Sequence, residues 1–272
     1  MNYRHAYHAG NFADCFKHAL YVWLLRAMAR KETPFFVLDT HAGTGNYDLT
    51  GSEAERTGEW RAGIGRLLAD TPPPLADYVG LVRELGLYPG SPAIARALLR
   101  KQDRLAVCEF HPVDAAALDR RFGRDGRVQV HRRDGYEAIG ALLPPPERRA
   151  LVLIDPPYER EDEFVAVVEA LTAGVSRLRG GVFAAWYPIK HRAPVREFFE
   201  GIKSAGLRDV IAAEIFLREP LDPARLNGCG LVVVNPPFRA EEEWPAMLEA
   251  LLGALGNREH GEGSDLLRVV GE

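Results

Sequence analysis

Short apolar segments alternate with helix-like stretches along almost the whole chain, and this alternation constrains the fold more than any other feature of the sequence. Each apolar segment is rich in β-branched or aromatic residues and ends at a polar residue or at a Gly or Pro signal. Such a pattern is typical of a parallel sheet with crossover helices. We predict a single α/β domain over residues 1–272, with seven strands at 35–39, 105–109, 127–131, 151–155, 181–186, 209–217 and 231–235.

Composition and charge restrict the class of protein. With 272 residues, of which 47% are apolar, the chain can bury a large core without disulfides. No apolar segment approaches the ~18 residues that span a bilayer, and the start lacks a signal-peptide pattern, so we expect a cytoplasmic protein without membrane contact, and a monomer. The three cysteines form no Cys-x-x-Cys pair, which argues against a disulfide or zinc framework. The net charge of −4 argues against binding a nucleic acid through overall charge. Any such contact must come from local basic patches.

Residues 40–104 separate the first two predicted strands by more than a simple crossover needs. Helix-like patterns over 53–68 and 75–85, separated by prolines at 72–74, predict a small helical subdomain inserted at residues 50–88. A crossover helix should then begin with Ser91 as N-cap and Pro92 in the first helical position. Apolar residues at helical spacing predict another helix over 11–30, and we expect the segment 1–30 to cover the ligand site.

The first predicted strand runs directly into a glycine-containing turn, Asp39-Thr40-His41-Ala42-Gly43-Thr44-Gly45. A glycine such as Gly43 lets the backbone approach a ligand closely, and the carboxyl edge of a parallel sheet is where nucleotide-like ligands bind. The turn is not a P-loop, because no Gly-Lys-Ser/Thr follows, and it lacks the third glycine of the dinucleotide fingerprint. A tight turn without a ligand is the alternative interpretation.

Acidic residues follow the next two predicted strands. Glu109 ends the second strand, where an acidic side chain usually binds a ribose diol through paired hydrogen bonds. Asp134, followed by Gly135, comes after the third strand, and a carboxylate there can accept a hydrogen bond from the amino group of an adenine. Taken alone, the Asp134-Gly135 pair also fits an ordinary turn.

Asp155-Pro156-Pro157-Tyr158 is the most informative motif in the sequence. Four apolar residues bring Asp155 to the end of the fourth strand, and two prolines then end the strand and restrict the backbone. The exocyclic amino group of adenine is a poor nucleophile because its lone pair is delocalised into the ring. Asp155 and the Pro156 carbonyl can accept its hydrogens, which favours a lone pair aimed at a methyl group, while the Tyr158 ring can stack on the base.

A similar motif, Asn235-Pro236-Pro237-Phe238, follows the last predicted strand and can also hold an amino group. We favour Asp155 because the strand that follows the Asp134 loop should lie beside the first strand, whereas the last strand should lie away from it. A structural turn is the alternative interpretation of the Asn235 motif.

The N-terminal segment mixes aromatic and basic residues, among them Tyr3, Arg4 and Lys17. This mixture favours contact with a nucleic acid or a cover over the cofactor, with a plain surface segment as the alternative. His5 and His8 are three residues apart, but no carboxylate or cysteine completes a metal-binding set, so we expect no metal. Further basic residues that can build an RNA-binding patch, or can be solvated surface charges, are Arg56, Arg61, Arg66, Arg132, Arg133, Lys190, His191 and Arg192.

Together these motifs resemble the large-subunit ribosomal RNA methyltransferase J family, which makes N6-methyladenine in 23S ribosomal RNA. The resemblance covers almost the whole chain and rests on Tyr3-Arg4-His5-x-x-His8-Ala9-Gly10-Asn11-x-Ala13-Asp14-x-x-Lys17-His18, Leu38-Asp39-Thr40-His41-Ala42-Gly43-x-Gly45, Glu55-Arg56-Thr57-Gly58-Glu59, Tyr88-Pro89-Gly90-Ser91-Pro92, Asp155-Pro156-Pro157-Tyr158 and Trp186-Tyr187-Pro188. Two segments depart from the family pattern: Lys190-His191-Arg192 is more basic than expected, and the tail from Arg258 onward does not match.

The resemblance implies a Rossmann-like class I methyltransferase fold, an inserted helical subdomain and S-adenosyl-L-methionine as cofactor. It implies that Asp155 is the active-site acceptor and that Tyr3 gates the substrate side. We therefore expect a cofactor site formed by His18, His41, Gly43, Ser91, Glu109, Asp134, Gly135 and Asp155, a catalytic set formed by Asp155, Pro156 and Tyr158, and substrate contacts from Tyr3, Arg4, Lys17 and Tyr158.

The function expected from the motifs and the resemblance is methylation of an adenine N6 in 23S ribosomal RNA, as protein-free RNA or an early assembly intermediate. DNA or another RNA is an alternative substrate, because Asp-Pro-Pro-Tyr contacts the base and not the sugar. A non-catalytic RNA-binding assembly factor is a second alternative, against which the cofactor turn, Glu109 and Asp155 argue. A nicotinamide-dependent oxidoreductase would need a compact βαβ fingerprint, which the insertion interrupts.

Overall fold

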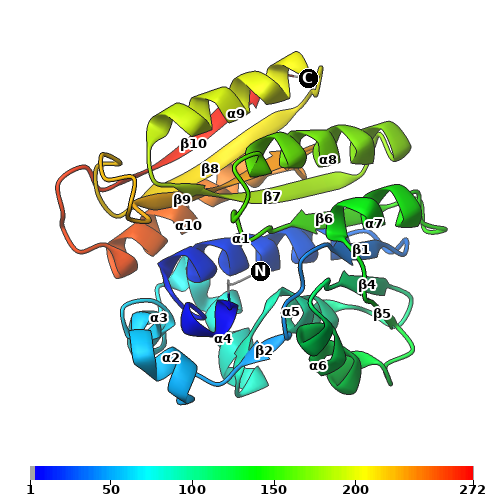
Figure 1. The fold of residues 1–272 in the computed structure, drawn as a ribbon, viewed down its shortest axis with the longest axis horizontal. Helices are drawn as coiled ribbons and strands as arrows, with labels where there is room; N and C mark the ends of the chain where they lie inside the picture. Colours follow the sequence, from blue (N-terminus) through cyan, green and yellow to red (C-terminus); the bar gives the residue numbers. More distant parts are fainter. Residues whose placement is uncertain (1–3, 272) are drawn as a thin grey trace.

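An eight-stranded sheet runs through the middle of the molecule, in a computed structural model that describes residues 4–271 (Figure 1). Its strands are β1 (Phe36–Asp39), β4 (Arg104–Cys108), β5 (Val128–His131), β6 (Ala150–Ile154), β7 (Val182–Ile189), β8 (Val210–Phe216), β9 (Gly228–Val234) and β10 (Gly263–Val270). They lie in the order β10-β8-β9-β7-β6-β1-β4-β5. A small second sheet pairs β2 (Asn46–Tyr47) with β3 (Tyr88–Pro89).

The direction of the strands determines which loops share an edge of the sheet. β1 pairs in parallel with β4 and β6, and the parallel pairing continues through β5 on one side and β7 on the other. β9 is antiparallel to both β7 and β8, and β10 is antiparallel to β8. The predicted α/β fold with a mostly parallel sheet is therefore confirmed. The loops that follow β1, β4, β5, β6 and β7 all leave the sheet at one edge.

The prediction of seven strands was wrong by one, because β10 lies in the tail for which no strand was expected. β10 is an edge strand whose side chains are only partly buried, and it carries the charged residues Asp265 and Arg268. It follows β9 and the helix at residues 240–255, and it pairs antiparallel with β8. A half-exposed edge strand with charges gives a weak apolar signal, which explains why it was missed.

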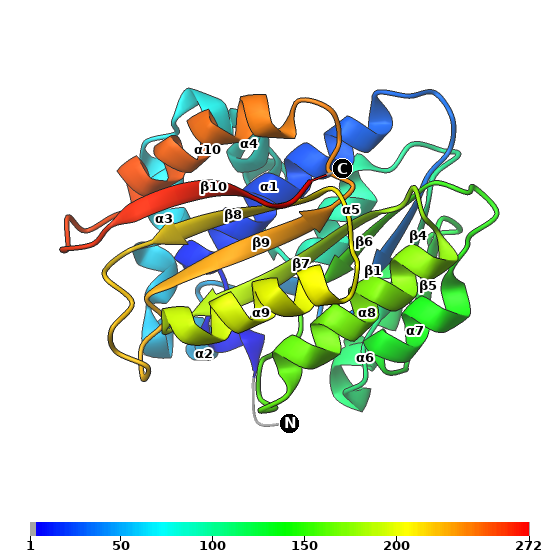
Figure 2. The same cartoon turned by 90° about the horizontal axis from the view of Figure 1, so that it is seen from above.

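Two layers of helices cover the faces of the sheet (Figure 2). One face packs against α1 (Phe12–Ala29), α5 (Ser91–Leu98) and α10 (Ala240–Leu255), and the other packs against α7 (Gly135–Leu142), α8 (Glu163–Arg177) and α9 (Arg192–Ser204). The remaining crossover helix, α6 (Pro112–Phe122), follows β4. Each face of the sheet has its own apolar core, as expected for strands that are buried on both sides.

Helix α1 is buried over most of its length and confirms the helix predicted over 11–30. Asn11 caps it, with its side-chain oxygen accepting a hydrogen bond of 3.0 Å from the Asp14 backbone N–H. Near its other end Trp23 packs edge-on against Trp244 of α10, with 5.6 Å between the ring centroids. The helix thus holds the N-terminal segment against the sheet.

Residues 50–88 form α2 (Ser52–Thr57), η2 (Glu59–Arg61), α3 (Ile64–Ala69), η3 (Pro73–Leu75) and α4 (Ala76–Leu85). The continuous pattern predicted over 53–68 is therefore wrong in detail, because Gly58 adopts a left-handed conformation (φ 63°) and Gly63 also departs from helical geometry. The gap at Gly63 lets the Ile64 N–H donate to the Gly10 carbonyl at 2.8 Å. The interrupted helix is therefore hydrogen-bonded to the N-terminal segment, and the two lie side by side in Figure 1.

The start of α5 also differs by one residue from the prediction. Gly90 is the N-cap, Ser91 is the first helical residue, and the Ser91 side chain makes no capping hydrogen bond. Gly90 donates its N–H to the Gly45 carbonyl at 2.9 Å, which ties this helix to the turn after β1. Ser91 is left buried beside that turn, facing the cavity described below.

Candidate active site

A cavity of about 660 Å³ lies at the edge of the sheet where the parallel strands end. The residues of the predicted cofactor, catalytic and substrate sets that line it are Lys17, His18, His41, Gly43, Ser91, Glu109, Asp134, Gly135, Asp155, Pro156 and Tyr158. Arg4 does not line it; its guanidinium is exposed and pairs with Glu53 at 3.2 Å. Tyr3 lies outside the described residues. One cavity thus unites residues far apart in the sequence.

The turn after β1 is shaped by a glycine and held by Glu109. Gly43 has a φ of +58°, and a Cβ there would lie 2.4 Å from the Tyr47 hydroxyl. Its N–H donates to Glu109 Oε2 at 2.9 Å, while the His111 N–H donates to Glu109 Oε1 at 2.7 Å. Burial raises the pKa of Glu109, and the two backbone donors oppose that shift. The carboxylate is therefore fixed between two loops at the cavity wall.

Asp134 and Gly135 connect the end of β5 to the start of α7. Asp134 is the N-cap of this helix, with Oδ1 accepting hydrogen bonds from the N–H groups of Tyr136 (2.8 Å) and Glu137 (3.2 Å). A Cβ on Gly135 would lie 2.0 Å from the Thr40 carbonyl oxygen, so the two loops meet backbone to backbone. The pair thus forms a turn and also lines the cavity. Its position agrees with both interpretations of the sequence, a structural turn and a ligand-binding position.

Two histidines line the cavity, of which His18 is buried and His41 is partly buried, and their lowered pKa values keep both neutral at pH 7. His41 Nδ1 lies 2.8 Å from the Thr40 hydroxyl, which itself donates to the Leu153 carbonyl at 3.0 Å. Since that hydroxyl proton is engaged, His41 Nδ1 must be the donor, which leaves Nε2 as an acceptor. His18 Nδ1 lies 3.0 Å from the Tyr88 hydroxyl. Burial lowers the pKa of His18 to about 3 and that of His41 to about 4.

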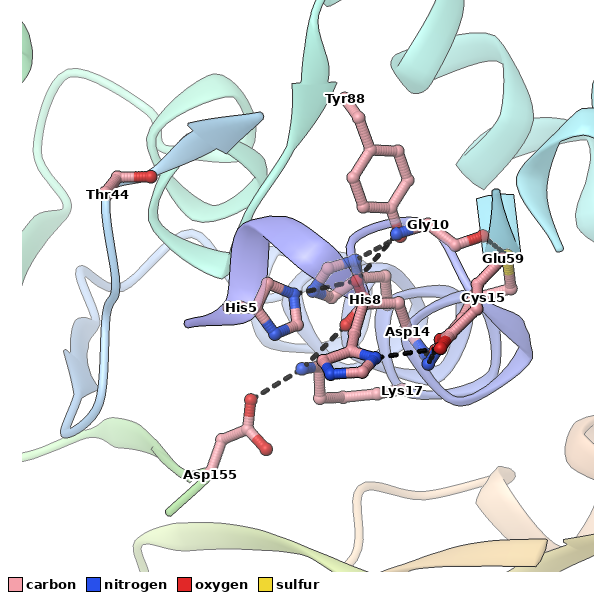
Figure 3. Close-up of polar contacts among 12 residues, drawn as sticks. His5, His8, Gly10, Asp14, Cys15, Lys17, Thr44, Glu59, Tyr88 and Asp155 are labelled. Atoms are coloured by element: carbon pink, nitrogen blue, oxygen red, sulfur yellow. Dashed lines mark hydrogen bonds and ion pairs between the residues drawn. The ribbon is translucent and has the colours of Figure 1, made fainter. Parts of the chain in front are cut away.

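Asp155 is ion-paired with a lysine from the N-terminal helix (Figure 3). Lys17 Nζ lies 2.5 Å from Asp155 Oδ2 and 3.1 Å from Asp14 Oδ1, and Asp14 Oδ2 lies 2.9 Å from His5 Nε2. Burial alone would raise the pKa of Asp14, but His5 and Lys17 hold it well below its ordinary value. Lys17 was predicted as a substrate contact. The structure brings its ammonium group to the carboxylate predicted to be catalytic.

Tyr158 is held in an uncommon conformation at the cavity wall. Its φ is +51°, and its hydroxyl donates to the Trp186 carbonyl at 2.8 Å. Its ring packs edge-on against Phe164 and Trp186, with centroid distances of 5.0 and 5.8 Å. A non-glycine residue with positive φ at a site is a strained feature that the surrounding contacts must maintain. These contacts orient the tyrosine ring beside Asp155.

The competing Asn235 motif lies at the opposite edge of the sheet, because β9 runs antiparallel to β7. The Asn235 amide group donates to the carbonyls of Arg179 and Gly181 at 2.9 and 2.7 Å, and Asn235 does not line the cavity. Asn235 thus has a structural role, because it ties the loop at Arg179 and Gly181 to the end of β9. This supports the choice of Asp155 as the catalytic candidate.

Several residues of the cavity wall were not singled out from the sequence, among them Phe110, Tyr136 and Glu163. Phe110 directly follows Glu109 and leaves 65% of its surface exposed, so its position after a strand end was an available signal. Tyr136 follows Gly135 and donates its hydroxyl to Glu163 Oε1 at 2.6 Å. Glu163 begins α8 and is buried. No local pattern could have predicted its role, because its partner comes from another helix.

The basic residues proposed for an RNA patch are not equivalent. Of the eight, Lys190 alone lines the cavity. Arg61 pairs with Glu55, Arg66 donates to the carbonyls of Leu255 and Gly256 at 3.1 Å, and Arg192 pairs with Glu214 at 2.7 Å. The structure thus assigns several of them to internal contacts.

Within residues 4–271, no group of three or more His, Cys, Asp or Glu side chains is arranged to hold a metal ion. None of the helices in the same range has the length and apolar character needed to span a bilayer. The three cysteines are buried and free, as their spacing indicated.

We expect the free energy of unfolding to decrease by about 2 kcal/mol or more between pH 7 and pH 4.5. His18 and His41 have folded pKa values of about 3 and about 4, below their ordinary 6.5, so on acidification the unfolded chain binds protons that the folded chain cannot. Asp39 opposes this, because burial raises its pKa to about 7 and the folded chain then holds the extra proton. The loss of stability from the two histidines is larger than the gain from Asp39. Urea denaturation at several pH values measures the difference.

Asp39→Asn is the matched variant for this measurement. It removes the opposing group, so its unfolding free energy should fall more steeply with acid, by up to about 1.4 kcal/mol per pH unit between pH 7 and 4. Stability that increases on acidification in the unaltered chain, or the same slope in both chains, would contradict the assignment of these protonation states.

Comparison with known families and structures decides the class of this protein. Residues 32–266 match the family model described as "Ribosomal RNA large subunit methyltransferase D, RlmJ". The chain belongs to the RlmJ family. Membership confirms the resemblance found in the motifs and, together with the largely parallel sheet, the predicted Rossmann-like class I methyltransferase fold. It also establishes the protein as a methyltransferase of large-subunit ribosomal RNA.

Relatives of known name and structure cover almost the whole chain. The RlmJ proteins named "Ribosomal RNA large subunit methyltransferase J" from Haemophilus influenzae and Escherichia coli are 40% and 39% identical, over 94% and 89% of this chain and 94% and 90% of theirs. A crystal structure of a protein from Legionella pneumophila is 33% identical, covers 96% of this chain and 98% of its own, and superposes with a TM-score of 0.88.

Proposed function

We propose that this chain transfers a methyl group from S-adenosyl-L-methionine to the N6 amino group of an adenine in 23S ribosomal RNA. The observation that carries the proposal is the meeting of Asp155 of the Asp-Pro-Pro-Tyr motif with Glu109 and Asp134 in one cavity. Family membership limits the reaction to methyl transfer onto large-subunit ribosomal RNA. The carboxylate and the aromatic ring of this motif support an exocyclic amino nitrogen of adenine as the atom that receives the methyl group.

The cavity wall fits a nucleoside cofactor that ends in an amino acid. Glu109 is positioned by two backbone donors to accept hydrogen bonds from a ribose diol, and Asp134 Oδ2, which takes no part in the helix cap, can accept from an adenine amino group. His18, His41, Gly43, Ser91 and Gly135 would complete the site. S-adenosyl-L-methionine supplies a methyl group on a sulfonium sulfur when it is bound there.

The chain's own residues would prepare the acceptor nitrogen. Asp155 Oδ1 has no hydrogen-bond partner among residues 4–271, so it can accept an amino hydrogen while Oδ2 stays paired with Lys17. The carbonyl of Pro156 accepts the second hydrogen, and the Tyr158 ring supports the base from its side. After methylation the nitrogen has four bonds and must release a proton. Asp155 is the nearest group that can accept it.

The partners follow from the same proposal. We propose protein-free 23S ribosomal RNA or an early assembly intermediate as substrate, a monomeric enzyme that acts in the cytoplasm, and no metal. DNA remains the alternative to be tested, because the base-contacting residues would act on adenine in either polymer. A non-catalytic assembly factor is disfavoured by family membership.

The test is transfer of labelled methyl from S-adenosyl-L-methionine to protein-free large-subunit ribosomal RNA that lacks its native modifications, with unmodified duplex DNA in parallel. We expect N6-methyladenosine in the RNA alone, identified by mass spectrometry of the nucleosides. Label in DNA at a comparable rate would overturn the choice of polymer. A methylated nucleoside other than N6-methyladenosine would overturn the choice of acceptor atom.

A further inference from the structure

The order of strands in the sheet sets the order of residues along the cavity. Reading across β4, β1, β6 and β7, the wall is built from Glu109, then His41, then Asp155, and then Lys190 after the end of β7. β9 begins at the same edge because it is antiparallel to β7, with Ile189 paired to Gly228. Leu226, just before β9, also lines the cavity. Glu109 and Lys190 therefore lie at opposite ends, with Asp155 between them.

The two ends of the cavity differ in charge. Glu109, Asp114 and Asp134 line the end near β4 and β5. At the other end Lys190 is exposed, and its side chain makes no ion pair or hydrogen bond with any residue between 4 and 271. A polyanion that enters the cavity is repelled at the first end and attracted at the second.

The basic segment after Trp186-Tyr187-Pro188 divides into three different roles. His191 caps α9 by accepting a hydrogen bond from the Ala193 N–H at 3.2 Å. Arg192 pairs with the buried Glu214 at 2.7 Å, and its guanidinium lies 5.1 Å from the centre of the Phe216 ring. Of the three, only Lys190 presents a cation without a partner in the described part of the chain.

The loop between β8 and β9 carries a second exposed cation, Arg225, on a backbone that is tied to Lys190. The buried Asn227 donates its side-chain amide to the carbonyls of Lys190 and Asp222, both at 2.7 Å, and so ties the loop to the end of β7. Arg225 lies in this loop with Leu226 and Ala224, which line the cavity, on either side. Its side chain is exposed and makes no ion pair or hydrogen bond within residues 4–271, although after Arg218 it contributes to lowering the pKa of Glu259. Asn227 thus ties together the backbone segments that carry Lys190 and Arg225.

We propose that Lys190 and Arg225 form a phosphate-binding rim that contacts the RNA backbone beside the target adenosine. The proposal rests on the proposed function, because it takes Asp155 and Tyr158 as the place of the adenine. A base inserted there leaves its sugar and phosphates outside, and beyond Tyr158 the cavity continues toward Lys190. Since the whole chain carries a charge of −4, RNA must be attracted by local cations, and Lys190 at the cavity and Arg225 on the adjoining loop can supply them.

The test compares Lys190→Ala/Arg225→Ala with Lys101→Ala/Arg208→Ala. Lys101 and Arg208 are exposed, make no side-chain hydrogen bond or ion pair within residues 4–271, and precede β4 and β8 at the opposite edge of the sheet. Methyl transfer to a transcript of large-subunit ribosomal RNA is measured at several salt concentrations. We expect the rim variant to raise KM about tenfold near 0.15 M salt, and its log-log salt slope to be smaller by about 1.4, or 0.7 for each lost phosphate contact.

The control variant should keep the unaltered KM and salt slope, although it removes the same charge. Calorimetric binding of S-adenosylhomocysteine should be unchanged in the rim variant, which shows that its fold and cofactor site are intact. Lys190→Arg/Arg225→Lys should restore the KM. A rim variant with the KM and slope of the control would overturn the proposal.

Failure of the proposed function can be told apart from failure of the rim. If the unaltered chain transfers no methyl group to the transcript, the proposed function fails. In that case the salt dependence of RNA binding is measured by filter retention with the same two double variants. This measurement tests the phosphate-binding rim independently of methyl transfer.

Discussion

Asp155→Ala is expected to lower kcat for methyl transfer by about 10²- to 10⁴-fold, the range for loss of a group that positions a reactant and accepts its proton. The variant removes the carboxylate at the end of β6 while the ion pair between Lys17 and Asp14 remains. Binding of S-adenosylhomocysteine should persist within a few-fold, because Glu109 and Asp134 are untouched. Single-turnover transfer of labelled methyl measures the first effect and calorimetry measures the second.

Two companion variants sharpen this result. Asp155→Asn keeps the shape of the side chain but removes the charge paired with Lys17, and it should also be strongly impaired if proton acceptance is required. Asn235→Ala alters the similar motif at the other edge of the sheet and should keep near-normal turnover, although it loses two hydrogen bonds to the loop of Arg179 and Gly181. Equal turnover in Asp155→Ala and the unaltered chain would remove Asp155 from the mechanism. A loss in Asn235→Ala as deep as that of Asp155→Ala would reverse the choice of motif.

Glu109→Ala is expected to weaken binding of S-adenosyl-L-methionine by about 1 to 3 kcal/mol, which corresponds to about 5- to 150-fold in Kd. The change removes the acceptor for a ribose diol and leaves the N–H groups of Gly43 and His111 without their partner. The turn at Gly43 then loses one of its fixed contacts, which adds to the direct loss. Isothermal titration calorimetry measures Kd.

Glu137→Ala is the matched control for the Glu109 variant. Glu137 is an exposed acid in the first turn of α7, close to the cavity but not part of its wall, so its removal changes the charge equally. Its Kd should equal that of the unaltered chain. An unchanged Kd in Glu109→Ala would exclude the ribose-binding role, and a shift of the same size in both variants would show that the effect is one of overall charge.

Strands buried on both faces were the most predictable elements of the fold. β6 (Ala150–Ile154) and β1 (Phe36–Asp39) read as nearly continuous apolar segments because both faces of each pack against helices, and each is followed directly by polar residues that line the cavity. β10 could not be predicted in the same way. Its partly exposed side chains carry charges, and its position beside β8 depends on antiparallel pairing with a strand some 50 residues earlier.

The helical insertion shows the limit of periodicity. Apolar spacing predicted helix over 53–68, yet Gly58 and Gly63 divide the segment into α2, η2 and α3. A Cβ on Gly63 would lie 2.0 Å from the Gly10 carbonyl, so the break is required by the close approach of the N-terminal segment. That requirement comes from a distant part of the chain and leaves no periodic signal.

The sequence by itself determined the class of fold, the family and the residues that end each strand at the cavity, because each of these depends on local order: an apolar segment, a turn, and a polar residue next to it. Only the tertiary structure decided which charges meet. The pairing of Lys17 with Asp155 joins residues 138 positions apart, and the burial of Arg192 against Glu214 leaves Lys190 as the available cation of its segment. Electrostatic partners act through distances in space and through burial, and neither quantity is encoded at any single position of the chain.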